Sequence, residues 1–440
     1  MQKVAIVSLG CPRNRVDTET AAHFLKEGGF SFVYYEAEAD IIIVNTCSFI
    51  NSAKEESIDT ILELSRYKKS GSCKKLVVTG CLPQRYKDEL INLLPEVDVF
   101  LGTNEYQALP EILHQNKRGL FIGYSTLIQE SFTPRILSQS PYTAYLKIAE
   151  GCLHNCSYCV IPSIRGKLRS RKIDALVTEA ETLVNKGAIE IILVAQDSTD
   201  YGKDLNNGST LTKLLKSLVK IKRLSWIRLL YAYPDGINSE LIELIRDEEK
   251  ICNYIDVPIQ HVNSRILKLM RRNIANTDRL KRKLEIIRNS IPDISLRTSI
   301  IVGFPTETNS EFEELLSFIK EFKFDNLGVF AYSKEEGTKA AEMKGQIPER
   351  IKELRRKTVM EQQKKVVQTI NKKKVGKVFD VLIEGISQET ELLLAGRGYF
   401  QAPEIDGIVY INEGTTENGK IEKVKIIKSI GYDFIGKICN

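Results

Sequence analysis

The first 122 residues alternate short, almost continuously apolar runs with amphipathic stretches, and this alternation predicts strands and helices in turn. The apolar runs predicted as strands are 3–10, 39–47, 75–81 and 97–102. The amphipathic stretches predicted as helices are 17–28, 54–69 and a segment that ends at Leu94. Strands that are apolar on both faces belong to parallel sheets with helices on each side. We therefore expect an α/β unit with a doubly wound parallel sheet.

Residues 123–142 interrupt this pattern, because they show no periodicity and contain serine and proline, and we expect a linker there. Beyond it, over 143–372, the alternation of strands and helices resumes. The predicted strands are 143–150, 189–196, 226–234, 254–260, 295–303 and 326–333. The clearest helices between them are predicted at 174–186, 211–222 and 310–322. Six strand–helix units predict a partial (β/α)6 barrel rather than a complete barrel of eight units.

The pattern changes again in the last part of the sequence. A polar, basic helix is predicted from 348 to 372, and residues 373–440 then form short apolar runs separated by glycine turns. Such runs are typical of a small β-barrel. The sequence therefore predicts three domains, at 1–122, 143–372 and 373–440, with the linker between the first two.

Composition narrows the functional classes. The chain has 440 residues, of which 42% are hydrophobic and 27% charged, and these values are typical of a soluble globular protein. No apolar run approaches the ~20 residues that cross a bilayer, and the first residues resemble a strand rather than a signal peptide. We expect a cytoplasmic protein with no membrane partner. In that compartment, nine cysteines indicate metal binding or catalysis rather than disulfides.

The net charge of +6 is small but unevenly distributed. Residues 350–377 contain eleven lysines and arginines against two glutamates, which is either a solvated helix face or a contact for RNA phosphate. Residues 378–440 contain six basic against ten acidic residues. An acidic barrel suits a basic protein partner better than naked RNA, although it is also compatible with a cap that only stabilises the fold.

Three cysteines follow three predicted strands of the first domain. Cys11, Cys47 and Cys81 end the segments SLGC, VNTC and VTGC. In parallel sheets ligands gather outside the carboxyl ends of the strands, so these three thiols are expected to converge. The alternative for each is a small buried hydrophobic residue.

A second set of three cysteines lies in EGCLHNCSYC, after the first strand of the second domain. Cys152, Cys156 and Cys159 follow the spacing Cys-x3-Cys-x2-Cys. Structural zinc takes four ligands, and His154 would be strained as the fourth because it lies between two of the cysteines. A [4Fe–4S] cluster held by three cysteines keeps one iron open, and an open iron can bind and orient a small molecule.

These residues carry a family resemblance. The CxxxCxxC spacing, with Tyr158 before the last cysteine at the end of a first barrel strand, resembles the radical S-adenosylmethionine superfamily. The following CVIPSIRGKLRSR contains an IPxxRGxxxSR pattern that resembles the methylthiotransferase branch of that superfamily. The resemblance extends over essentially the whole chain. It implies that the open iron chelates the amino and carboxylate groups of S-adenosylmethionine.

The resemblance also implies a second cofactor site and a reaction. Enzymes of this branch have an N-terminal domain whose three cysteines hold another [4Fe–4S] cluster, a radical domain and a β-barrel TRAM domain. Cys11, Cys47 and Cys81 match the N-terminal set. One S-adenosylmethionine would supply the methyl group and a second would generate the radical. A carbon without acidic hydrogen would then receive a methylthio group, a step for which cofactors must supply the chemistry.

Five residues are expected, from the resemblance and from their places at strand ends, to contact S-adenosylmethionine. They are Tyr158, Gln196, Asp197, Arg297 and Gly303. The cofactor carboxylate would be a suitable partner for an arginine inside a strand. Each also has a structural alternative, since Asp197 could cap a turn and Gly303 could permit close backbone approach.

Four other residues with reactive side chains lie outside the two cysteine sets. His261 stands at a strand end and has either a structural or a direct role. Cys73, Cys252 and Cys439 are most simply structural residues.

Within this family the sequence is most similar to the RimO branch, which modifies the β-carbon of an aspartate in ribosomal small-subunit protein twelve. SLGCPRNRVD, AQDSTDYG and GRGYFQAPEIDGIVYI carry this likeness. The departures are Arg13, where lysine is usual, and Ser48, where glycine is common, and we expect neither to touch a cluster ligand. The alternatives are the MiaB-like branch, which modifies a tRNA adenosine, and a non-catalytic iron–sulfur protein for electron transfer. The expected partners are the ribosomal protein, free or in the ribosome, and an electron donor such as a flavodoxin or ferredoxin.

Overall fold

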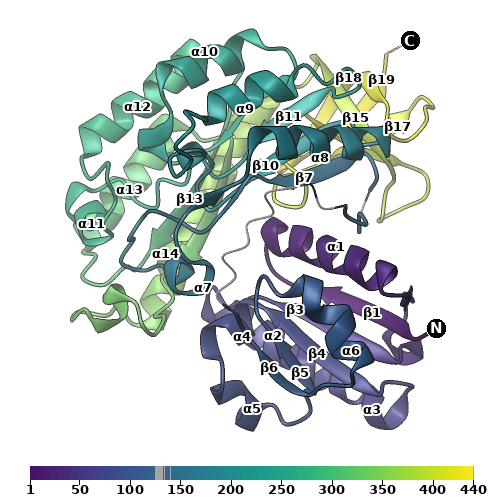
Figure 1. The fold of residues 1–440 in the computed structure, drawn as a ribbon. Helices are drawn as coiled ribbons and strands as arrows, with labels where there is room; N and C mark the ends of the chain where they lie inside the picture. The colour runs from purple at the N-terminus through teal and green to yellow at the C-terminus, as the bar shows by residue number, and fades with distance from the viewer. Residues whose placement is uncertain (124–131, 133, 139, 440) are drawn as a thin grey trace.

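Six parallel strands form the first sheet of the computed structural model, in the order β2-β1-β3-β4-β5-β6 (Figure 1). The strands are β1 (Lys3–Ser8), β2 (Ser31–Phe32), β3 (Ile41–Thr46), β4 (Lys75–Gly80), β5 (Val99–Leu101) and β6 (Gly119–Phe121). The helices are α1 (Pro12–Glu27), α2 (Asn51–Ser65), α3 (Tyr67–Ser70), α4 (Cys81–Tyr86), α5 (Glu89–Leu93) and α6 (Leu109–His114). The structure describes residues 1–123, 132, 134–138 and 140–439.

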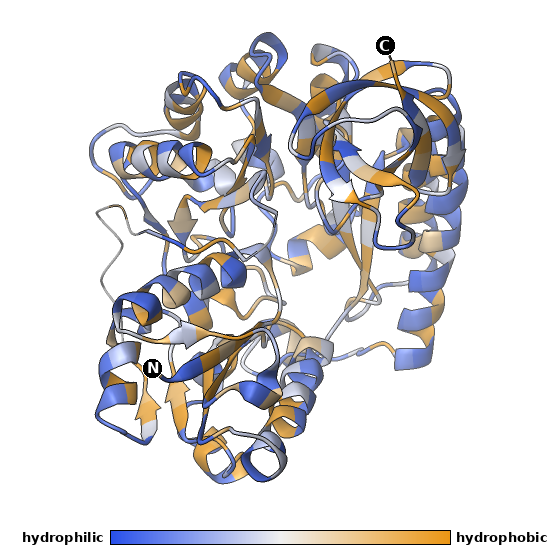
Figure 2. Cartoon of the chain, turned by 90° about the vertical axis from the view of Figure 1, so that its right-hand side faces the viewer, coloured by the Kyte–Doolittle hydropathy of each residue, from blue (hydrophilic) through white to orange (hydrophobic). Residues whose placement is uncertain are grey.

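The side chains of β3 explain why this sheet is covered on both faces. Ile41 and Ile43 pack into one hydrophobic cluster, with α1 and α6, and Ile42 and Val44 pack into another, with α2. Successive side chains of a strand point to opposite faces, so an unbroken apolar strand needs helices on both. The strands of this sheet are mainly hydrophobic and its covering helices are mixed in colour (Figure 2). The predicted doubly wound parallel sheet is confirmed.

Helix α1 begins at Pro12, directly after Cys11, and not near Asp17 as predicted. Proline suits the first helical position, because the amide it lacks would have no partner there and its φ is already helical. The sequence prediction also missed β6, which is only three residues long.

The second sheet has six parallel strands in the order β14-β13-β12-β11-β10-β7, and its two edge strands do not pair with each other. The strands are β7 (Thr143–Lys147), β10 (Glu190–Val194), β11 (Trp226–Leu229), β12 (Ile251–Asp256), β13 (Ser295–Val302) and β14 (Asn326–Ala331), and a small ribbon adds β8 (Ala149–Glu150) and β9 (Arg169–Ser170). The helices are α7 (Ile161–Arg165), α8 (Ile173–Asn185), α9 (Leu211–Leu218), α10 (Ser239–Asp247), α11 (Ser264–Leu269), α12 (Thr277–Ser290), α13 (Asn309–Phe322) and α14 (Glu349–Lys372). The predicted partial barrel of six units is confirmed.

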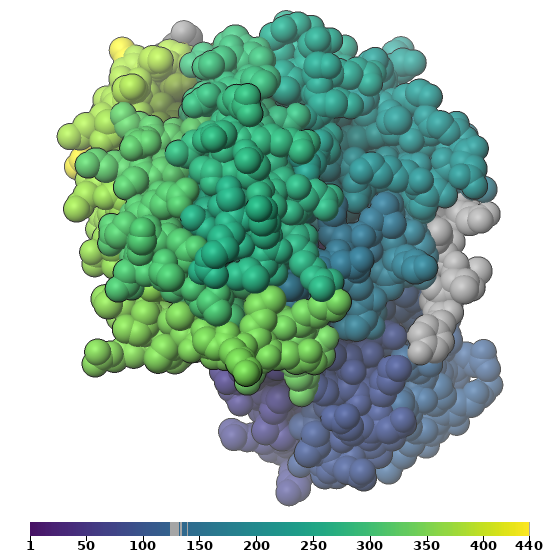
Figure 3. Space-filling model, turned by 90° about the vertical axis from the view of Figure 1, so that its left-hand side faces the viewer, coloured from purple at the N-terminus to yellow at the C-terminus, as the bar shows by residue number. Residues whose placement is uncertain are grey.

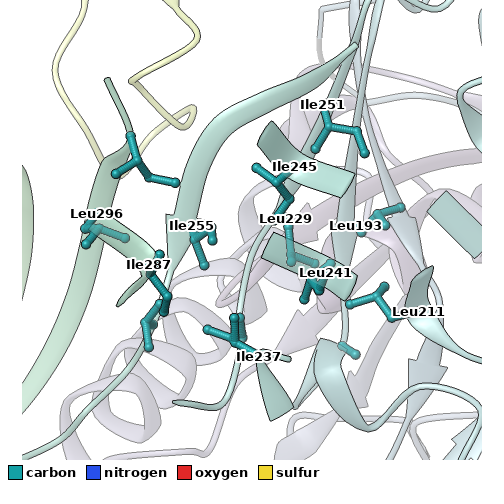
Figure 4. Close-up of a cluster of buried hydrophobic side chains, with 14 of the residues drawn as sticks. Leu193, Leu211, Leu229, Ile237, Leu241, Ile245, Ile251, Ile255, Ile287 and Leu296 are labelled. Carbon is teal, nitrogen blue, oxygen red and sulfur yellow. The ribbon is translucent and has the colours of Figure 1, made fainter. Parts of the chain in front are cut away.

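One row of side chains crosses this sheet. Leu193, Leu229, Ile255 and Leu296 are paired from strand to strand, and they lie in one buried cluster with helix residues such as Leu241 (Figure 4). All five are at most 2% exposed. Burying one such side chain contributes about 1.5–3 kcal/mol, so this layer holds the strand ends in fixed positions.

The last strands close into a β-barrel in the order β15-β16-β17-β19-β18, which confirms the predicted small barrel. They are β15 (Val378–Ile386), β16 (Leu394–Gly398), β17 (Val409–Glu413), β18 (Ile421–Ile430) and β19 (Asp433–Ile438). No helix among the described residues has the length and apolarity to cross a bilayer. The boundaries predicted for the three domains, 1–122, 143–372 and 373–440, remain predictions.

Part of the predicted linker 123–142 lies outside the described residues. Within the described part, Arg135 is buried and pairs with Glu19 of α1 at 2.7 Å and with Glu179 of α8 at 2.9 Å. This segment is therefore anchored to both α/β units through one arginine.

Buried charges attach the C-terminal barrel to the second sheet. The Glu190 carboxylate of β10 lies 2.7 Å from Arg228 Nε and 2.6 Å from Arg397 Nη2 of β16. Burial alone would raise the pKa of Glu190, but Arg228 and Arg397 outweigh it and hold the pKa at about 2. Because this pKa is lowered, the stabilisation is present above the ordinary pKa of 4.5 and is lost as pH falls towards 2.

Glu190→Gln is expected to lower the free energy of unfolding by about 3 kcal/mol, because it leaves two buried guanidinium groups without their shared partner. Chemical denaturation at pH 7 measures this change, and the difference from the parent protein should shrink as pH falls below about 4. Glu240→Gln, which removes a surface pair to Lys216, is the matched control and should not shift the transition. Equal effects of the two substitutions would contradict this account.

Candidate active site

The first set of cysteines lies at one edge of the first sheet. Cys11 caps α1 after β1, Cys47 follows β3, and Cys81 begins α4 after β4. These three strands are neighbours in the sheet, and the thiol of each cysteine is near enough to the other two for their charges to interact. The strand order therefore brings the three cysteines together at one edge of the sheet, as predicted.

Glycines shape two of these turns. A Cβ atom on Gly10 would lie 2.7 Å from Cys47 Cβ, and one on Gly80 would lie 2.2 Å from Asn45 Oδ1. Both residues also have φ near +90°, a conformation that other residues rarely adopt. The glycine before Cys11 and the glycine before Cys81 are therefore required for the thiols to approach one another.

The second set lies in the loop between β8 and α7. Cys159 N donates to Cys156 O at 3.1 Å, and His154 N lies 3.4 Å from Cys152 Sγ, so the loop folds back on itself around the thiols. Again each thiol interacts electrostatically with the others. The short spacing in the sequence is therefore a compact cluster in space.

The donor sets fit an iron–sulfur cluster better than a bare zinc ion. Among the described residues, neither set has its three sulfur atoms all within 4.8 Å of one another. Tetrahedral zinc with Zn–S bonds of about 2.3 Å would need sulfurs about 3.8 Å apart. Three soft thiolates with wider separation leave space for a larger inorganic group, as a [4Fe–4S] cluster requires.

The second set and Cys11 of the first set border one cavity of about 390 Å³, a volume typical of small-molecule sites. The first unit contributes Cys11, Arg13, Phe49 and Ile50, and the second contributes all three cysteines of its loop. The first unit, purple to blue, lies directly against the teal and green second unit (Figure 3). The cavity thus lies at the interface between the two α/β units.

Three of the five residues predicted to contact S-adenosylmethionine line this cavity: Tyr158, Gln196 and Asp197. Gln196 Nε2 donates to Glu150 Oε1 at 2.9 Å, and its buried Oε1 has no hydrogen-bond partner among the described residues. Such an atom is costly unless a ligand donates to it. The orphaned Oε1 therefore supports a bound group with hydrogen-bond donors beside the second cysteine set.

Asp197 has the structural role that the sequence analysis left open, and it also faces the cavity. Its Oδ1 accepts from Thr199 N at 2.8 Å and caps a short turn, while its Oδ2 accepts from His154 Nε2 at 2.7 Å. His154 also stacks on Tyr233, with ring centroids 4.0 Å apart. These contacts fix the cysteine loop against the end of β10.

Arg297 and Gly303 are not among the residues that line the cavity. Arg297 is near the start of β13 and pairs with Asp406 of the C-terminal barrel. Gly303 has a φ of +70°, and a Cβ there would lie 2.4 Å from Lys352 Cγ of α14. The structural explanation therefore accounts for both residues, and the geometry gives no support to their predicted contacts with the cofactor.

His261 likewise does not line the cavity. It is fully buried, and its Nδ1 accepts from Asn263 N at 2.9 Å. Its buried Nε2 lies 3.6 Å from Glu307 Oε1 and has no hydrogen-bond partner among the described residues, so the role of this histidine stays a prediction.

The sequence analysis missed two arginines of the cavity. Arg13 Nη1 donates to Ala195 O at 2.7 Å across the interface, and its charge acts on Cys11. Arg272 lies 3.7 Å from the centre of the Tyr233 ring, and its Nη2 donates to Pro258 O. The sequence analysis expected Arg13 not to touch a cluster ligand, and its guanidinium nevertheless acts on Cys11 through its charge. Its place two residues after Cys11, at the start of a helix, was the available signal.

Burial and nearby charge act differently on the pKa values of the individual cysteine thiols. Burial raises the pKa of Cys47 and of Cys159 to about 12 and that of Cys152 to about 11. Burial also acts to raise the pKa of Cys11, but Arg13, the Asn14 amide and Arg165 together lower it below its ordinary value. The raised values mean that most of these thiols ionise only beside added positive charge, which a metal centre would supply.

In metal-free protein at pH 7, Cys11 is expected to react with iodoacetamide at least about tenfold faster than Cys47 or Cys159, because only the thiolate is the nucleophile. Peptide mass spectrometry measures the rates, with the exposed Cys439 as the standard for reagent delivery. Arg13→Gln should slow alkylation of Cys11 several-fold. Equal rates at Cys11 and Cys159 would refute the electrostatic account.

Three family descriptions match successive parts of the chain. They are Uncharacterized protein family UPF0004 over residues 3–102, Radical SAM superfamily over residues 146–319 and TRAM domain over residues 375–439. They divide the chain in the same order as the three structural units.

Full-length relatives carry one common name. Proteins called ribosomal protein uS12 methylthiotransferase RimO are 50% identical in Citrifermentans bemidjiense, 51% in Geotalea uraniireducens and 50% in Geobacter sulfurreducens. Each alignment covers 99% of this chain and 98% of the relative.

Solved structures share the fold at low sequence identity. The radical S-adenosylmethionine methyltransferase TsrM from Kitasatospora setae, described with cobalamin and a [4Fe–4S] cluster bound, matches with a TM-score of 0.55 at 13% identity over 75% of each chain. The cobalamin-dependent S-adenosylmethionine radical enzyme OxsB matches with a TM-score of 0.54 at 14% identity, over 84% of this chain and 56% of that one.

Proposed function

Because this chain belongs to the RimO family of ribosomal protein uS12 methylthiotransferases, we propose that it attaches a methylthio group to the β-carbon of an aspartate in that ribosomal protein. It is a radical S-adenosylmethionine enzyme with a TRAM domain. The observation that carries the proposal is the single cavity that receives three cysteines from one unit and Cys11 from the other. Sulfur insertion at an unactivated carbon needs a radical source and a sulfur source within reach of the same atom.

The cysteines would hold the iron–sulfur groups. Cys152, Cys156 and Cys159 would bind one [4Fe–4S] cluster, and the N-terminal set would bind the other. When bound, the clusters and S-adenosylmethionine supply hydrogen-atom abstraction at carbon and the methylthio group that replaces the hydrogen. The protein's own part is to orient these groups and to exclude water.

Three cavity residues would orient the cofactor. The unpartnered Gln196 Oε1 suits the cationic amino group of S-adenosylmethionine, since an ammonium has only donors. Tyr158 packs beside Ile266 and Met270 and closes the apolar side of the site. Asp197 holds His154 and thereby the cysteine loop. The mainly apolar lining would keep water from the reacting carbon.

The cavity lining contains a cation that suits an aspartate substrate. Arg13 brings a guanidinium to this lining from the first unit, and a buried carboxylate needs such a partner. The acidic C-terminal barrel, with six basic against ten acidic residues, favours a basic protein over a bare nucleic acid. These two features favour the ribosomal protein over a tRNA adenosine.

Contact with ribosomal RNA through residues 350–377 remains part of the proposal, with a smaller set of cations than the sequence predicts. Lys352 Nζ donates to Tyr332 O at 2.9 Å, and Arg355 pairs with Glu307 at 3.2 Å, so both are used within the fold. Lys374 is also largely buried and lies 3.9 Å from Asp325. The remaining lysines and arginines of this segment are the candidates for phosphate contact. The electron donor, such as a flavodoxin or ferredoxin, is likewise proposed.

Deletion of the gene is expected to abolish the methylthio group on the uS12 aspartate and to leave tRNA methylthio-adenosine unchanged. Mass spectrometry of the ribosomal protein and of tRNA nucleosides from the same cells measures both. Complementation with the intact gene should restore the aspartate modification, and a gene encoding Cys152→Ala should not. Loss of the tRNA modification with an intact uS12 modification would instead support the MiaB-like alternative.

Anaerobically reconstituted protein is expected to contain about eight iron atoms, because each set of three cysteines would hold a four-iron cluster. Replacing all three cysteines of one set by alanine should leave about four iron atoms, whichever set is removed. Cys73→Ala, at a buried cysteine outside both sets, is the control and should keep the full content. Loss of all iron in either triple variant would argue against two independent sites.

A further inference from the structure

Arg165, the last residue of α7, reaches from the second unit into the first. Its side chain is buried, and its Nη2 lies 3.3 Å from Cys81 Sγ, within hydrogen-bond distance of a sulfur acceptor. The same nitrogen donates to Asn14 Oδ1 of α1. A cation from the second unit therefore donates to a sulfur of the first cysteine set.

The guanidinium of Arg165 is held by carboxylates on both sides of the interface. Its Nη1 lies 2.8 Å from Asp17 Oδ2 of α1 and 3.3 Å from Glu150 Oε2 of β8. Lys147 Nζ pairs with the same two carboxylates. Two cations and two carboxylates balance one another, so the position of Arg165 does not depend on the charge of Cys81.

This network ends at the cofactor side of the cavity. Glu150 Oε1 accepts from Gln196 Nε2, and Gln196 lines the cavity beside the second cysteine set. Helix α7 starts two residues after Cys159, and its Ile164 packs against Cys81. The segment from Cys159 to Arg165 thus carries a thiol of the second set. About one helical turn later, it carries the side chains that contact Cys81 of the first set.

We propose that Arg165 is a positioning residue that fixes the Cys81 sulfur within the first cysteine set and raises the reduction potential of the cluster that this sulfur binds. The inference rests on the proposed function, because it takes Cys81 as a cluster ligand. Hydrogen bonds to cluster sulfurs and nearby positive charge stabilise the reduced, more negative state. A donor that is itself a cation has the stronger effect.

The test uses full-length protein in which Cys152, Cys156 and Cys159 are replaced by alanine, so that only the N-terminal cluster assembles. Its reduction midpoint and EPR spectrum are measured in a potentiometric titration, with Arg165 intact and with Arg165→Gln or Arg165→Lys. Arg165→Gln should lower the midpoint, so that the reduced-to-oxidised ratio at the parent's midpoint falls about tenfold. Arg165→Lys keeps the charge but not the forked geometry and should give an intermediate shift.

Arg171→Gln is the matched control. Arg171 is also a buried arginine shortly after α7, and it pairs with Glu179 at 2.6 Å and donates to Lys147 O rather than to a cysteine. It should lose stability like Arg165→Gln and keep the parent's midpoint. A purely structural role for Arg165 predicts the same midpoint in both variants.

The outcomes separate the inference from the proposed function. An unchanged midpoint and spectrum in Arg165→Gln would overturn the inference while leaving the cluster assignment intact. If Arg165→Gln assembles no cluster, the Arg165→Lys variant is the test. A reduction midpoint of Arg165→Lys equal to the parent's would then overturn the inference. Absence of iron from the parent triple variant would instead refute Cys81 as a ligand and, with it, the proposed function.

Discussion

The buried ion network between α1 of the first unit and the second α/β unit is the interaction on which the active-site architecture depends. Removing charged groups from water is costly, and the cost is offset only where every charge is paired in good geometry. Arg165 and Lys147 meet this condition with Asp17 and Glu150 in one arrangement of the two units. Because Cys11 directly precedes Pro12, the first residue of α1, the orientation that satisfies the charges also turns Cys11 towards the cavity.

Contacts on the far side of the cavity hold the same orientation. Glu335, which follows β14 and lines the cavity, lies 2.8 Å from Arg85 and 3.1 Å from Lys54 of the first unit. The C-terminal barrel adds a third contact, between Glu404 and Arg15 of α1. A cavity held on several sides can keep two reactive groups at a fixed separation, which reactions between bound groups require.

Local patterns in the sequence predicted most of the fold, because strands, helices and turns follow from short-range periodicity and glycine placement. The two cysteine sets could be predicted for the same reason, since strand-end position and loop spacing are local features. The partners of Arg165 and Arg297 could not be predicted this way. Asp17 is 148 residues from Arg165, and Asp406 is 109 residues from Arg297. Nothing in the local pattern shows which distant carboxylate an arginine will meet, and so Arg297 was expected to contact the cofactor rather than Asp406.

The central claim is that two three-cysteine sets, one from each α/β unit, hold separate clusters at one shared cavity. The most direct measurement is a crystal structure of the anaerobically reconstituted full-length protein, with iron located by its anomalous scattering. The account predicts two four-iron clusters, one on Cys11, Cys47 and Cys81 and the other on Cys152, Cys156 and Cys159, with both facing the same cavity. A single cluster, or one that takes ligands from both sets, would contradict it.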